Sequence, residues 1–329
     1  MTIKQDSGNH WTRHGACAAP GEELCQAAGR KWPRSWFGCA LAAAGLLLPN
    51  SEALAGPSLD RIKATGVVRV AYRSASVPFS YLVDSRPVGY SIDLCRDVVD
   101  AIGRAIGAKA PLRIEFVEVT SATRLETIAA GGADLECEST TNTSERRMRV
   151  AFSVPIYVTG ARFAVKADAP LDELRDFNGK RIASTTGTSP LKSIRRVNEL
   201  HGLGMTISEV HDHGEGLDAV ERGSADAFVM DEVLLAGLIS TRPHPTALKI
   251  VGKYLTVEAL AIMLPKDDAA LKAVVDAELK QLIRAGTAAA MLNRWFLEPI
   301  PPKGVRIGLP MPYLLRDFWQ YPTDWIPDN

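Results

Sequence analysis

The amino-acid sequence predicts an α/β protein made of two similar lobes that face a common cleft. The first observation is that short β-branched runs alternate with helical patterns from Leu59 onward, which is typical of α/β architecture. The second is that this alternation occurs in two series that share one register. The third is that polar residues follow the ends of the predicted strands, where ligands gather in open α/β sheets.

The first series alternates strands with helices. Its elements are strand 67–72, helix 91–106, strand 113–119, helix 124–130 and strand 133–137. A second series repeats this order after residues 157–166, a stretch suited to a crossover between lobes. Its elements are strand 180–184, helix 189–200, strand 205–211, helix 217–222 and strand 225–230.

The two series match at identical spacing. Leu125, Ile128, Gly131, Ala133 and Asp134 correspond to Leu217, Val220, Gly223, Ala225 and Asp226. A helix-to-strand turn also offers a glycine and an aspartate by chance, so the match alone leaves that alternative open. Because the whole order of strands and helices restarts as well, we interpret the chain as one unit used twice.

After the second series the chain returns through residues 249–252, the apolar stretch 259–264 and a helix at 267–283. This return is able to rejoin the first lobe, which gives two crossing strands and a hinge. We therefore expect lobe 1 to begin with residues 56–160, lobe 2 to span 161–252, and residues 253–329 to return to lobe 1 and end in a C-terminal tail.

The composition is that of a soluble globular protein. The chain has 329 residues, of which 46% are apolar and 23% charged, enough for one large or two ordinary domains. Basic and acidic residues balance at 38 each, so the net charge does not indicate nucleic acid or a membrane surface as partner. Electrostatic specificity therefore has to be local.

Residues 1–55 have the pattern of a signal peptide with a long lead-in, which leaves the true start codon open. Basic residues at 30–34 precede the apolar run Trp36–Leu48, and small residues precede Gly56. The run is shorter than the roughly 20 residues that span a bilayer. We expect cleavage after Ala55 and an exported mature protein.

Cleavage there would remove three of the five cysteines and leave Cys95 and Cys137. In an oxidising compartment these two thiols are able to pair, but the sequence does not place them within bonding distance. Whether they pair stays open. Their spacing does not resemble a metal site, and we expect no metal, no other cofactor and no catalytic triad.

Candidate ligand-binding residues lie just beyond the strand ends. The shared register sets Ser121 against His213 and Ser139 against Asp231. Arg73 follows the first strand of lobe 1. The segment Thr185-Thr186-Gly187-Thr188-Ser189 follows that of lobe 2 and opens a helix, so it offers hydroxyls and free amides, either as a polar cradle or as a simple turn and cap.

Three arginines of lobe 1 suit anionic groups. They are Arg73, Arg124 and Arg146. A charged solute has to be desolvated in a closed cleft, and the guanidinium fork binds both oxygens of a carboxylate. A single arginine is usually a solvated surface charge. Three of them at strand ends or helix starts of one lobe instead favour a site for carboxylates.

Two further residues have both a functional and a structural interpretation. Asp231 would pair with an ammonium group, and it is also a favoured N-cap for the helix beginning near Val233. His213 would donate a hydrogen bond to a second carboxylate, more strongly as imidazolium. A lone histidine is usually structural, and its register match with Ser121 is what favours the functional interpretation.

Several motifs occur in the order typical of one family, between about Leu59 and Leu315. They are Val77-Pro78-Phe79-Ser80-Tyr81, Val88-Gly89-Tyr90-Ser91, the block Cys137–Arg146, Asp212-His213-Gly214, Met230-Asp231, Leu234-Leu235-Ala236-Gly237, and Trp295-Phe296 with Pro299–Lys303. With these motifs the chain resembles the family 3 periplasmic amino-acid-binding proteins, and most closely the glutamate/aspartate-binding components of ABC transporters.

The resemblance implies a type II periplasmic-binding-protein fold, with two mixed sheets flanked by helices and a double-strand hinge. It also implies a periplasmic monomer that is not an enzyme. Such a protein captures glutamate or aspartate and delivers it to an inner-membrane ABC transporter permease, without nucleic acid as a partner. Which of the two is preferred, how tightly it binds and which transporter is served stay open.

The resemblance further assigns roles to the candidate residues. Arg146, Ser139 and Thr141 would hold the α-carboxylate; Asp231, Thr185 and Thr188 the ammonium; Arg73, Ser121, Arg124 and His213 the side-chain carboxylate. A ligand with two carboxylates and one ammonium needs more cation than anion from the cleft, which agrees with the three arginines. A neutral amino acid would leave buried guanidinium groups unpaired.

The chain departs from the family at two positions. Glu138 precedes Ser139 where relatives tend to have a small residue, and strand alternation predicts that Glu138 points away from the ligand. Relatives also often pair the cysteine at the position of Cys137 with one near Ile262, which this chain lacks. That absence implies a free Cys137.

Two alternative functions are open. One is a small-acid dehydratase on the same scaffold, which needs a general acid with a tuned pKa, and Glu138 and His213 are its candidates. The other is a binding protein for another dicarboxylate or a polar amino acid. The exact solute is thus less firmly predicted than its class.

Overall fold

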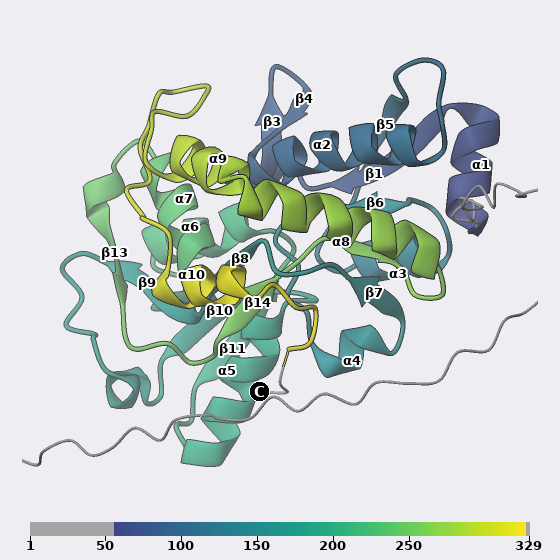
Figure 1. Ribbon diagram of the computed structural model, residues 1–329. Helices are drawn as coiled ribbons and strands as arrows, with labels where there is room; N and C mark the ends of the chain where they lie inside the picture. The colour runs from purple at the N-terminus through teal and green to yellow at the C-terminus, as the bar shows by residue number, and fades with distance from the viewer. Residues whose placement is uncertain (1–55, 327–329) are drawn as a thin grey trace, which may run out of the picture. The chain divides into compact units, whose positions relative to one another are not determined.

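The computed structural model describes residues 56–326. These residues form two five-stranded mixed sheets flanked by helices and joined by a two-stranded sheet, which confirms the predicted fold class (Figure 1). The expected signal peptide, its cleavage point and its three cysteines lie outside the described residues. In the described part of the chain, no helix is long and apolar enough to cross a membrane.

The first sheet has the strand order β5-β1-β6-β15-β7. Its strands are β1 (Val67–Tyr72), β5 (Arg113–Glu118), β6 (Leu135–Glu136), β7 (Val150–Phe152) and β15 (Met263–Pro265). Its helices are α1 (Pro57–Thr65), α2 (Tyr90–Ala105), α3 (Arg124–Ala129), α4 (Ser144–Arg147), α8 (Ala269–Arg284) and α9 (Thr287–Phe296). We call this sheet with its helices lobe 1.

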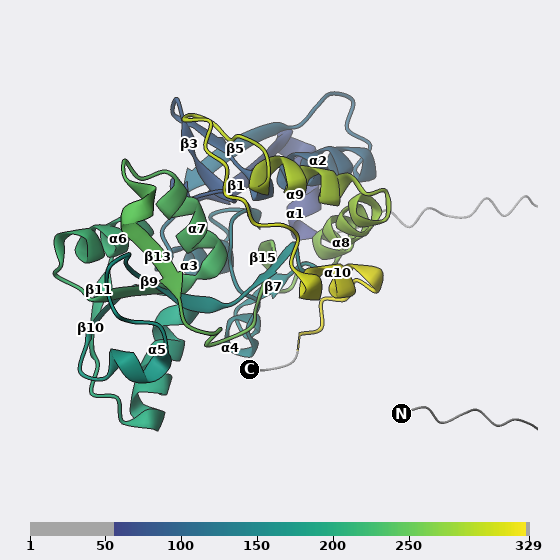
Figure 2. The ribbon, with the colours of Figure 1, turned by 90° about the vertical axis from the view of Figure 1, so that its left-hand side faces the viewer.

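The second sheet has the order β11-β10-β12-β9-β13. Its strands are β9 (Ala161–Lys166), β10 (Arg181–Thr185), β11 (Thr206–Val210), β12 (Ala227–Asp231) and β13 (Leu248–Val251). Its helices are α5 (Ser189–His201), α6 (His213–Arg222) and α7 (Glu232–Ser240), which surround the sheet in Figure 2. We call this sheet with its helices lobe 2.

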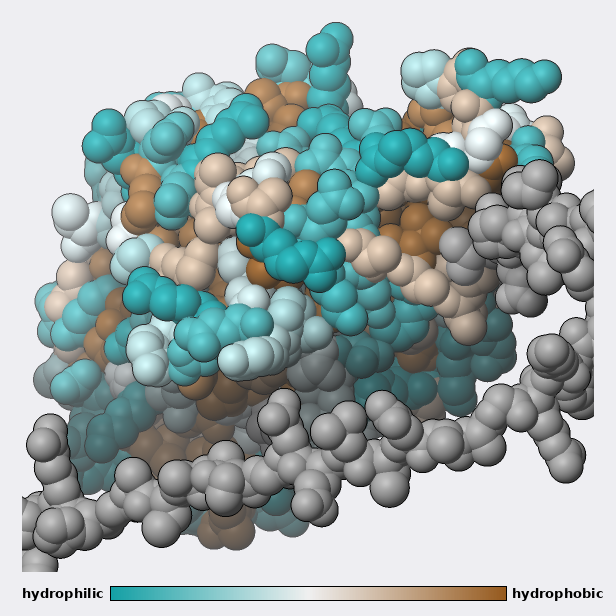
Figure 3. Space-filling view, in the orientation of Figure 1, coloured by the Kyte–Doolittle hydropathy of each residue, from teal (hydrophilic) through white to brown (hydrophobic). Residues whose placement is uncertain are grey.

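Smaller elements complete the fold. They are the three-stranded sheet of β2 (Ala75–Ser76), β3 (Ser80–Val83) and β4 (Arg86–Val88), the 3₁₀ turns Leu174–Phe177 and Pro245–Ala247, and the C-terminal helix α10 (Tyr313–Gln320). A groove between α2 and α8 is visible as a hollow in Figure 3, and its apolar lining consists largely of alanines 101, 105, 273 and 277.

The two sheets have the same topology, so the match in register reflects one repeated unit. In each, three parallel strands are followed by one strand that runs antiparallel to them and by a last strand that pairs antiparallel with that one. The Asp134 carboxylate accepts the Arg69 amide at 2.7 Å, and Asp226 accepts the Arg181 amide at 2.8 Å. The preceding glycines of the repeat both have positive φ, 71° and 75°, which an L side chain rarely adopts.

The link between the lobes is the antiparallel pair of β8 (Tyr157–Thr159) and β14 (Glu258–Leu260). Strand β8 leads into β9 at the start of lobe 2, and β14 follows β13 on the way back. Tyr157 stacks on Phe296 of α9 with the ring centroids 4.9 Å apart, which ties this pair of strands to lobe 1. The predicted double crossing is therefore present.

The largest departure from the sequence expectation is at strand 133–137, of which only Leu135–Glu136 pairs as β6. The chain then leaves the sheet and runs along β14. The Ala261 amide donates to the Thr140 carbonyl at 3.0 Å, and the Asn142 amide donates to the Ala259 carbonyl at 2.8 Å. Because the strand ends early, alternation of side chains does not extend to Glu138.

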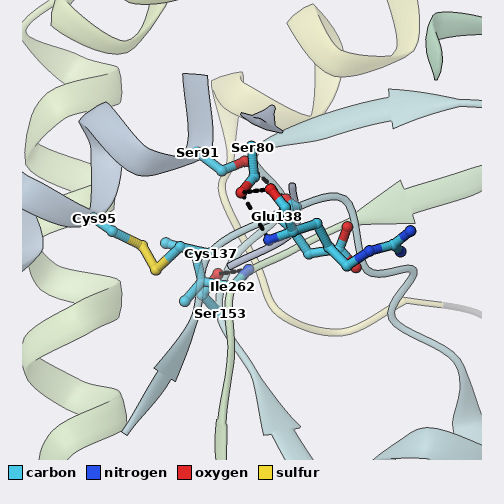
Figure 4. Close-up of a disulfide and its surroundings, with 8 residues drawn as sticks. Ser80, Ser91, Cys95, Cys137, Glu138, Ser153 and Ile262 are labelled. Carbon is cyan, nitrogen blue, oxygen red and sulfur yellow. Dashed lines mark hydrogen bonds between the residues drawn. A yellow bond between two sulfur atoms is a disulfide. The ribbon is translucent and has the colours of Figure 1, made fainter. Parts of the chain in front are cut away.

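Cys95 of α2 and Cys137 form a disulfide with their Cα atoms 6.3 Å apart (Figure 4). The sequence left this pairing open, and the expectation of a free Cys137 is wrong. A thiol near Ile262 is not needed, because α2 packs its own cysteine against the end of β6. The bond fixes the start of the segment that leaves the first sheet.

The disulfide closes a loop with a sequence separation of 42 residues, so replacing both cysteines by serine should lower the free energy of unfolding by about 2–4 kcal/mol. Urea unfolding of the mature protein, with and without reductant, measures this change. The wild type should lose stability in reductant, while the Cys95→Ser/Cys137→Ser variant should not respond. A wild type that is equally stable under both conditions would contradict the assignment.

Candidate functional site

The structure brings all ten predicted site residues together at one place between the lobes. Each is buried, with at most 8% of its surface exposed. A small cavity is lined by Ser121, Arg124, Ser139, Thr141, Thr188, His213 and Asp231 among others. The remaining three contact this lining: Arg73 binds Ser121, Arg146 binds Thr141, and Thr185 binds His213.

The parallel strands explain why these residues meet. Strand β10 ends at Thr185 and β12 ends at Asp231, while Arg73 follows directly after β1. Arg124 and His213 are the first residues of α3 and α6. Because the carboxyl ends of parallel strands lie at the same edge of a sheet, both lobes present these positions to the cleft.

The lobes touch each other across the cleft. The hydroxyls of Thr141 in lobe 1 and Ser189 in lobe 2 are 2.8 Å apart. The Arg146 guanidinium donates to the Gly187 carbonyl of lobe 2 at 3.1 Å and to the Thr141 carbonyl at 2.9 Å. The structure is therefore a closed arrangement of the two lobes.

Arg146 has carbonyl partners and no carboxylate partner within residues 56–326. Its backbone amide is held by the Thr143 hydroxyl, which caps α4. Burial lowers the pKa of Arg146, and the strongest opposing influence comes from Glu258 of β14. The buried guanidinium is thus oriented by the protein but not neutralised by direct contact.

Arg73 is in the same condition. Its guanidinium donates to the Ser121 hydroxyl, and no ion pair with a carboxylate is formed in the described part of the chain. The Ser80 hydroxyl accepts the Arg73 backbone amide at 2.9 Å and fixes the turn after β1. Burial lowers the pKa of Arg73, while the more distant Glu136, Asp212 and Glu118 raise it.

Arg124 differs from the other two, because the protein supplies its counter-charge. Its guanidinium forms an ion pair with Glu138, and Glu136 is 4.0 Å away. Burial lowers the pKa of Arg124 to about 9, with Arg146 acting in the same direction, so Arg124 remains a cation at neutral pH. Glu138 is not among the residues that line the cavity, although it pairs with Arg124, which does; the strand alternation used to predict its direction does not reach it, because β6 ends before it.

His213 is a neutral imidazole. Its Nδ1 lies 2.9 Å from the Thr185 hydroxyl. Burial lowers the pKa of His213 well below 6.5, and the charges of Arg73 and Arg124 act in the same direction. The expected strengthening of binding by an imidazolium therefore does not apply near neutral pH, and the ring acts as a neutral hydrogen-bonding group.

The two threonines expected near the ammonium group already have partners. Besides the contact of Thr185 with His213, the Thr188 hydroxyl donates to the Thr185 carbonyl at 2.6 Å. The Thr188 hydroxyl also accepts the Leu191 amide at 3.3 Å as the N-cap of α5. These hydroxyls order the start of α5 beside the cavity.

Asp231 lines the cavity with a carboxyl group that is not fully paired. Its Oδ1 is buried without a hydrogen-bond partner among the described residues. Burial raises the pKa of Asp231 well above 3.8, and Glu258 raises it further, while Arg124 and Arg146 lower it. Its side chain makes no capping bond to α7, so the N-cap interpretation is not realised.

Sequence reasoning missed Glu136, Thr140 and Glu258. Glu136 and Thr140 lie within or beside the motif that carried the resemblance, but only the folded chain shows that their side chains turn toward Arg124. Glu258 starts β14, where its carboxylate accepts the Thr256 hydroxyl at 2.7 Å. Within residues 56–326 no group of three His, Cys, Asp or Glu side chains is arranged to hold a metal ion.

The neutral state of His213 makes the stability of the ligand-free protein depend on pH. Below about pH 6.5 the unfolded chain binds a proton at this histidine and the folded chain does not, so acid favours unfolding. From pH 7 to pH 5 this histidine alone should cost about 2 kcal/mol of unfolding free energy.

A His213→Asn variant should lack this loss, because its amide does not titrate. Urea unfolding of both proteins at the two pH values measures the difference. His201, exposed on α5, offers the control substitution His201→Asn, which should behave like the wild type. Equal pH dependence in the wild type and in His213→Asn would refute a neutral buried imidazole.

Comparison with known proteins agrees with this geometry. Residues 68–298 match the sequence profile of the bacterial extracellular solute-binding proteins, family 3. The chain is 36% identical over 269 residues to the L-glutamate/L-aspartate-binding protein of Pseudomonas aeruginosa, covering 81% of this chain and 89% of that one. It is 34% identical over 283 residues to the glutamate/aspartate import solute-binding protein of Escherichia coli, covering 85% and 93%.

Solved structures share the fold. A variant of the arginine-binding protein of T. maritima has a TM-score of 0.64 at 22% identity, over 72% of this chain and 98% of that one. An ancestral amino acid-binding protein, described as a precursor of cyclohexadienyl dehydratase, has a TM-score of 0.62 at 25% identity, over 72% and 99%. The chain therefore belongs to the bacterial extracellular solute-binding proteins, family 3, as its motifs predicted.

Proposed function

We propose that the protein captures an acidic amino acid, glutamate or aspartate, outside the cytoplasm and delivers it to an ABC transporter in the membrane. The names of its relatives at 34–36% identity support this ligand class and this role. Export through a signal peptide cleaved after Ala55, a periplasmic location and a monomeric state are parts of the same proposal.

The observation that carries the proposal is the balance of unpaired charges in the cleft. Arg73 and Arg146 are buried cations without a carboxylate partner among residues 56–326, and Asp231 is a buried acid with an unpaired oxygen. Leaving a buried charge uncompensated costs several kcal/mol. Two cations and one acid, which ionises when an ammonium group pairs with it, match a ligand with two carboxylates and one ammonium.

The positions of these groups suggest which part of the ligand each one binds. Asp231 and Thr141 line the same cavity, and the Thr141 carbonyl accepts a hydrogen bond from Arg146, so Arg146 and Asp231 adjoin one cavity, as the α-carboxylate and the ammonium on one carbon atom require. We assign Arg146, with Ser139 and Thr141, to the α-carboxylate and Asp231 to the ammonium. Arg73, with Ser121 and His213, is then left for the distal carboxylate.

Closure around the ligand follows from the two-lobed division. Lobe 1 comprises residues 56–160 together with 253–329, lobe 2 comprises 161–252, and β8 with β14 is the hinge. The contacts of Thr141 and Arg146 with lobe 2 form only when the lobes meet. A ligand that neutralises Arg146 and Asp231 would therefore stabilise the closed arrangement.

The dehydratase alternative finds one point of support, the precursor named among the structural neighbours. The side-chain contacts favour binding without chemistry. Glu138 is paired with Arg124, and His213 is neutral and bonded to Thr185, so neither candidate acid faces the cavity with a proton to give. Incubation with glutamate followed by NMR should show bound ligand without turnover, and a new product would favour the enzyme.

The assignment of the two unpaired arginines predicts different effects on binding. Arg146→Met should weaken every amino acid about 100-fold or more, because truncating one partner of a buried charge pair costs 2–5 kcal/mol. Arg73→Met should weaken glutamate and aspartate by a similar factor but glutamine and asparagine by less than about tenfold. Calorimetric titration of the mature protein measures each dissociation constant.

The control for these variants is Arg149→Met, because Arg149 is exposed near α4 and pairs with Glu126 on the surface. It should bind all four amino acids like the wild type. If Arg146→Met weakened only the acids, the roles of the two arginines would be exchanged. If the wild type bound none of the four, the proposed function itself would fail.

The role of Asp231 is tested by a ligand that lacks the ammonium group. Asp231→Asn should weaken glutamate about 100-fold, since the ammonium loses its charge partner, and should leave glutarate unchanged or slightly tighter. Calorimetry with glutamate and with glutarate measures how much of the loss depends on the ammonium group. The neighbouring Glu232→Gln, whose carboxylate pairs with Arg162 instead, should affect neither ligand. Parallel losses for glutamate and glutarate in Asp231→Asn would contradict the assignment.

A further inference from the structure

The distal end of the cavity contains a third guanidinium, and the protein itself provides its partner. Arg124 lines the cavity together with Ser121 and His213. Its guanidinium forms the ion pair with Glu138 described above, while its Nε has no partner among the described residues. A ligand carboxylate that approached Arg124 would therefore meet a carboxylate already bound there.

Glu138 is held in place by hydroxyl groups on all sides. Its Oε2 accepts the Ser139 hydroxyl at 3.1 Å and the Ser76 hydroxyl at 3.3 Å, and its Oε1 accepts the Thr140 hydroxyl at 3.0 Å. Its backbone carbonyl accepts the Ser91 hydroxyl at 2.7 Å (Figure 4). The side chain is fully buried. The position is therefore built for a carboxylate.

A second acid, Glu136, belongs to the same cluster. The Thr140 hydroxyl is 2.8 Å from Glu136 Oε1 and 3.0 Å from Glu138 Oε1. A hydroxyl has one hydrogen, so it donates to one carboxyl and accepts from the other when that one is protonated. Burial raises the pKa of Glu136 and Arg124 lowers it; Glu136 lies 4.0 Å from the Arg124 guanidinium, whereas Glu138 contacts it directly. Arg124 and Glu138 therefore cancel each other.

We propose that Glu138 is a specificity-determining residue, which neutralises Arg124 from within the protein and thereby lets the distal pocket accept the amides glutamine and asparagine alongside glutamate and aspartate. This inference rests on the proposed function, because it concerns the distal end of the same site. With Arg124 neutralised, Arg73 is the guanidinium left for the distal group of the ligand among the described residues.

The chemistry of the two ligand classes explains the effect. A distal carboxylate gains Arg73, but the charge of Arg124 is already balanced by Glu138. A distal amide offers a carbonyl oxygen to Arg73 and Ser121, and it brings no charge that needs a second guanidinium. The preference for the acid is therefore smaller than two free guanidinium groups would produce.

The test compares the ratio of the glutamine and glutamate dissociation constants in three proteins. In the wild type the ratio should be within about tenfold of one. Glu138→Gln should raise it by tenfold or more, mainly by tightening glutamate, because Arg124 becomes available to the distal carboxylate. Glu136→Gln is the matched control from the same buried cluster, and it should leave the ratio unchanged because Glu136, 4.0 Å from Arg124, is not the carboxylate in direct contact with the guanidinium.

Calorimetry gives the constants, and circular dichroism melting verifies that each variant is folded. An unchanged ratio in Glu138→Gln, a rise in Glu136→Gln, or a wild type that rejects glutamine by 1000-fold or more would each overturn the inference. If Glu138→Gln does not fold, the ratio of the glutamine and glutamate dissociation constants in the wild type still tests the inference. If the wild type binds glutamate but Glu138→Gln has the same ratio as the wild type, this inference alone is refuted. If the wild type binds neither ligand, the proposed function is refuted.

Discussion

Three guanidinium groups, those of Arg73, Arg124 and Arg146, lie buried where the two lobes meet. Moving such a group out of water costs several kcal/mol unless an opposite charge and hydrogen bonds compensate it. The chain compensates Arg124 with Glu138 and gives the other two only hydroxyl and carbonyl oxygens. Closure of the empty cleft is therefore unfavourable, and a ligand that brings the missing charges makes it favourable.

The scaffold places these charges through its repeated unit and its hinge. In both lobes an aspartate just before one central strand, β6 or β12, accepts a backbone amide of the neighbouring strand, β1 or β10. This hydrogen bond fixes the register of the two strands and therefore the relative positions of their carboxyl ends. The segment after β6 then pairs with hinge strand β14 through Thr140 and Asn142. Arg146 follows this segment, so the guanidinium proposed to bind the α-carboxylate is attached to the pair of strands that links the lobes.

The sequence predicted features that depend on local backbone geometry and not those that depend on where a strand stops. Gly131 and Gly223 end helices with positive φ, and these fixed positions carried the register that located Ser121, His213, Ser139 and Asp231. The pairing of Arg124 with Glu138 was missed because alternation assumes a continuing strand. The disulfide and the neutral state of His213 likewise depend on neighbours that are distant in sequence.

The site divides into two halves with different tasks. In the proposed binding mode, Arg146 and Asp231 contact groups that every amino acid has, and the contacts of Arg146 and Thr141 with lobe 2 link this half to closure. The distal half, with Arg73, Arg124 and Glu138, lies almost wholly in lobe 1. Its charge balance is therefore able to change without disturbing closure. A single carboxylate in the distal half alters which side chain is accepted, while the mechanism of capture stays the same.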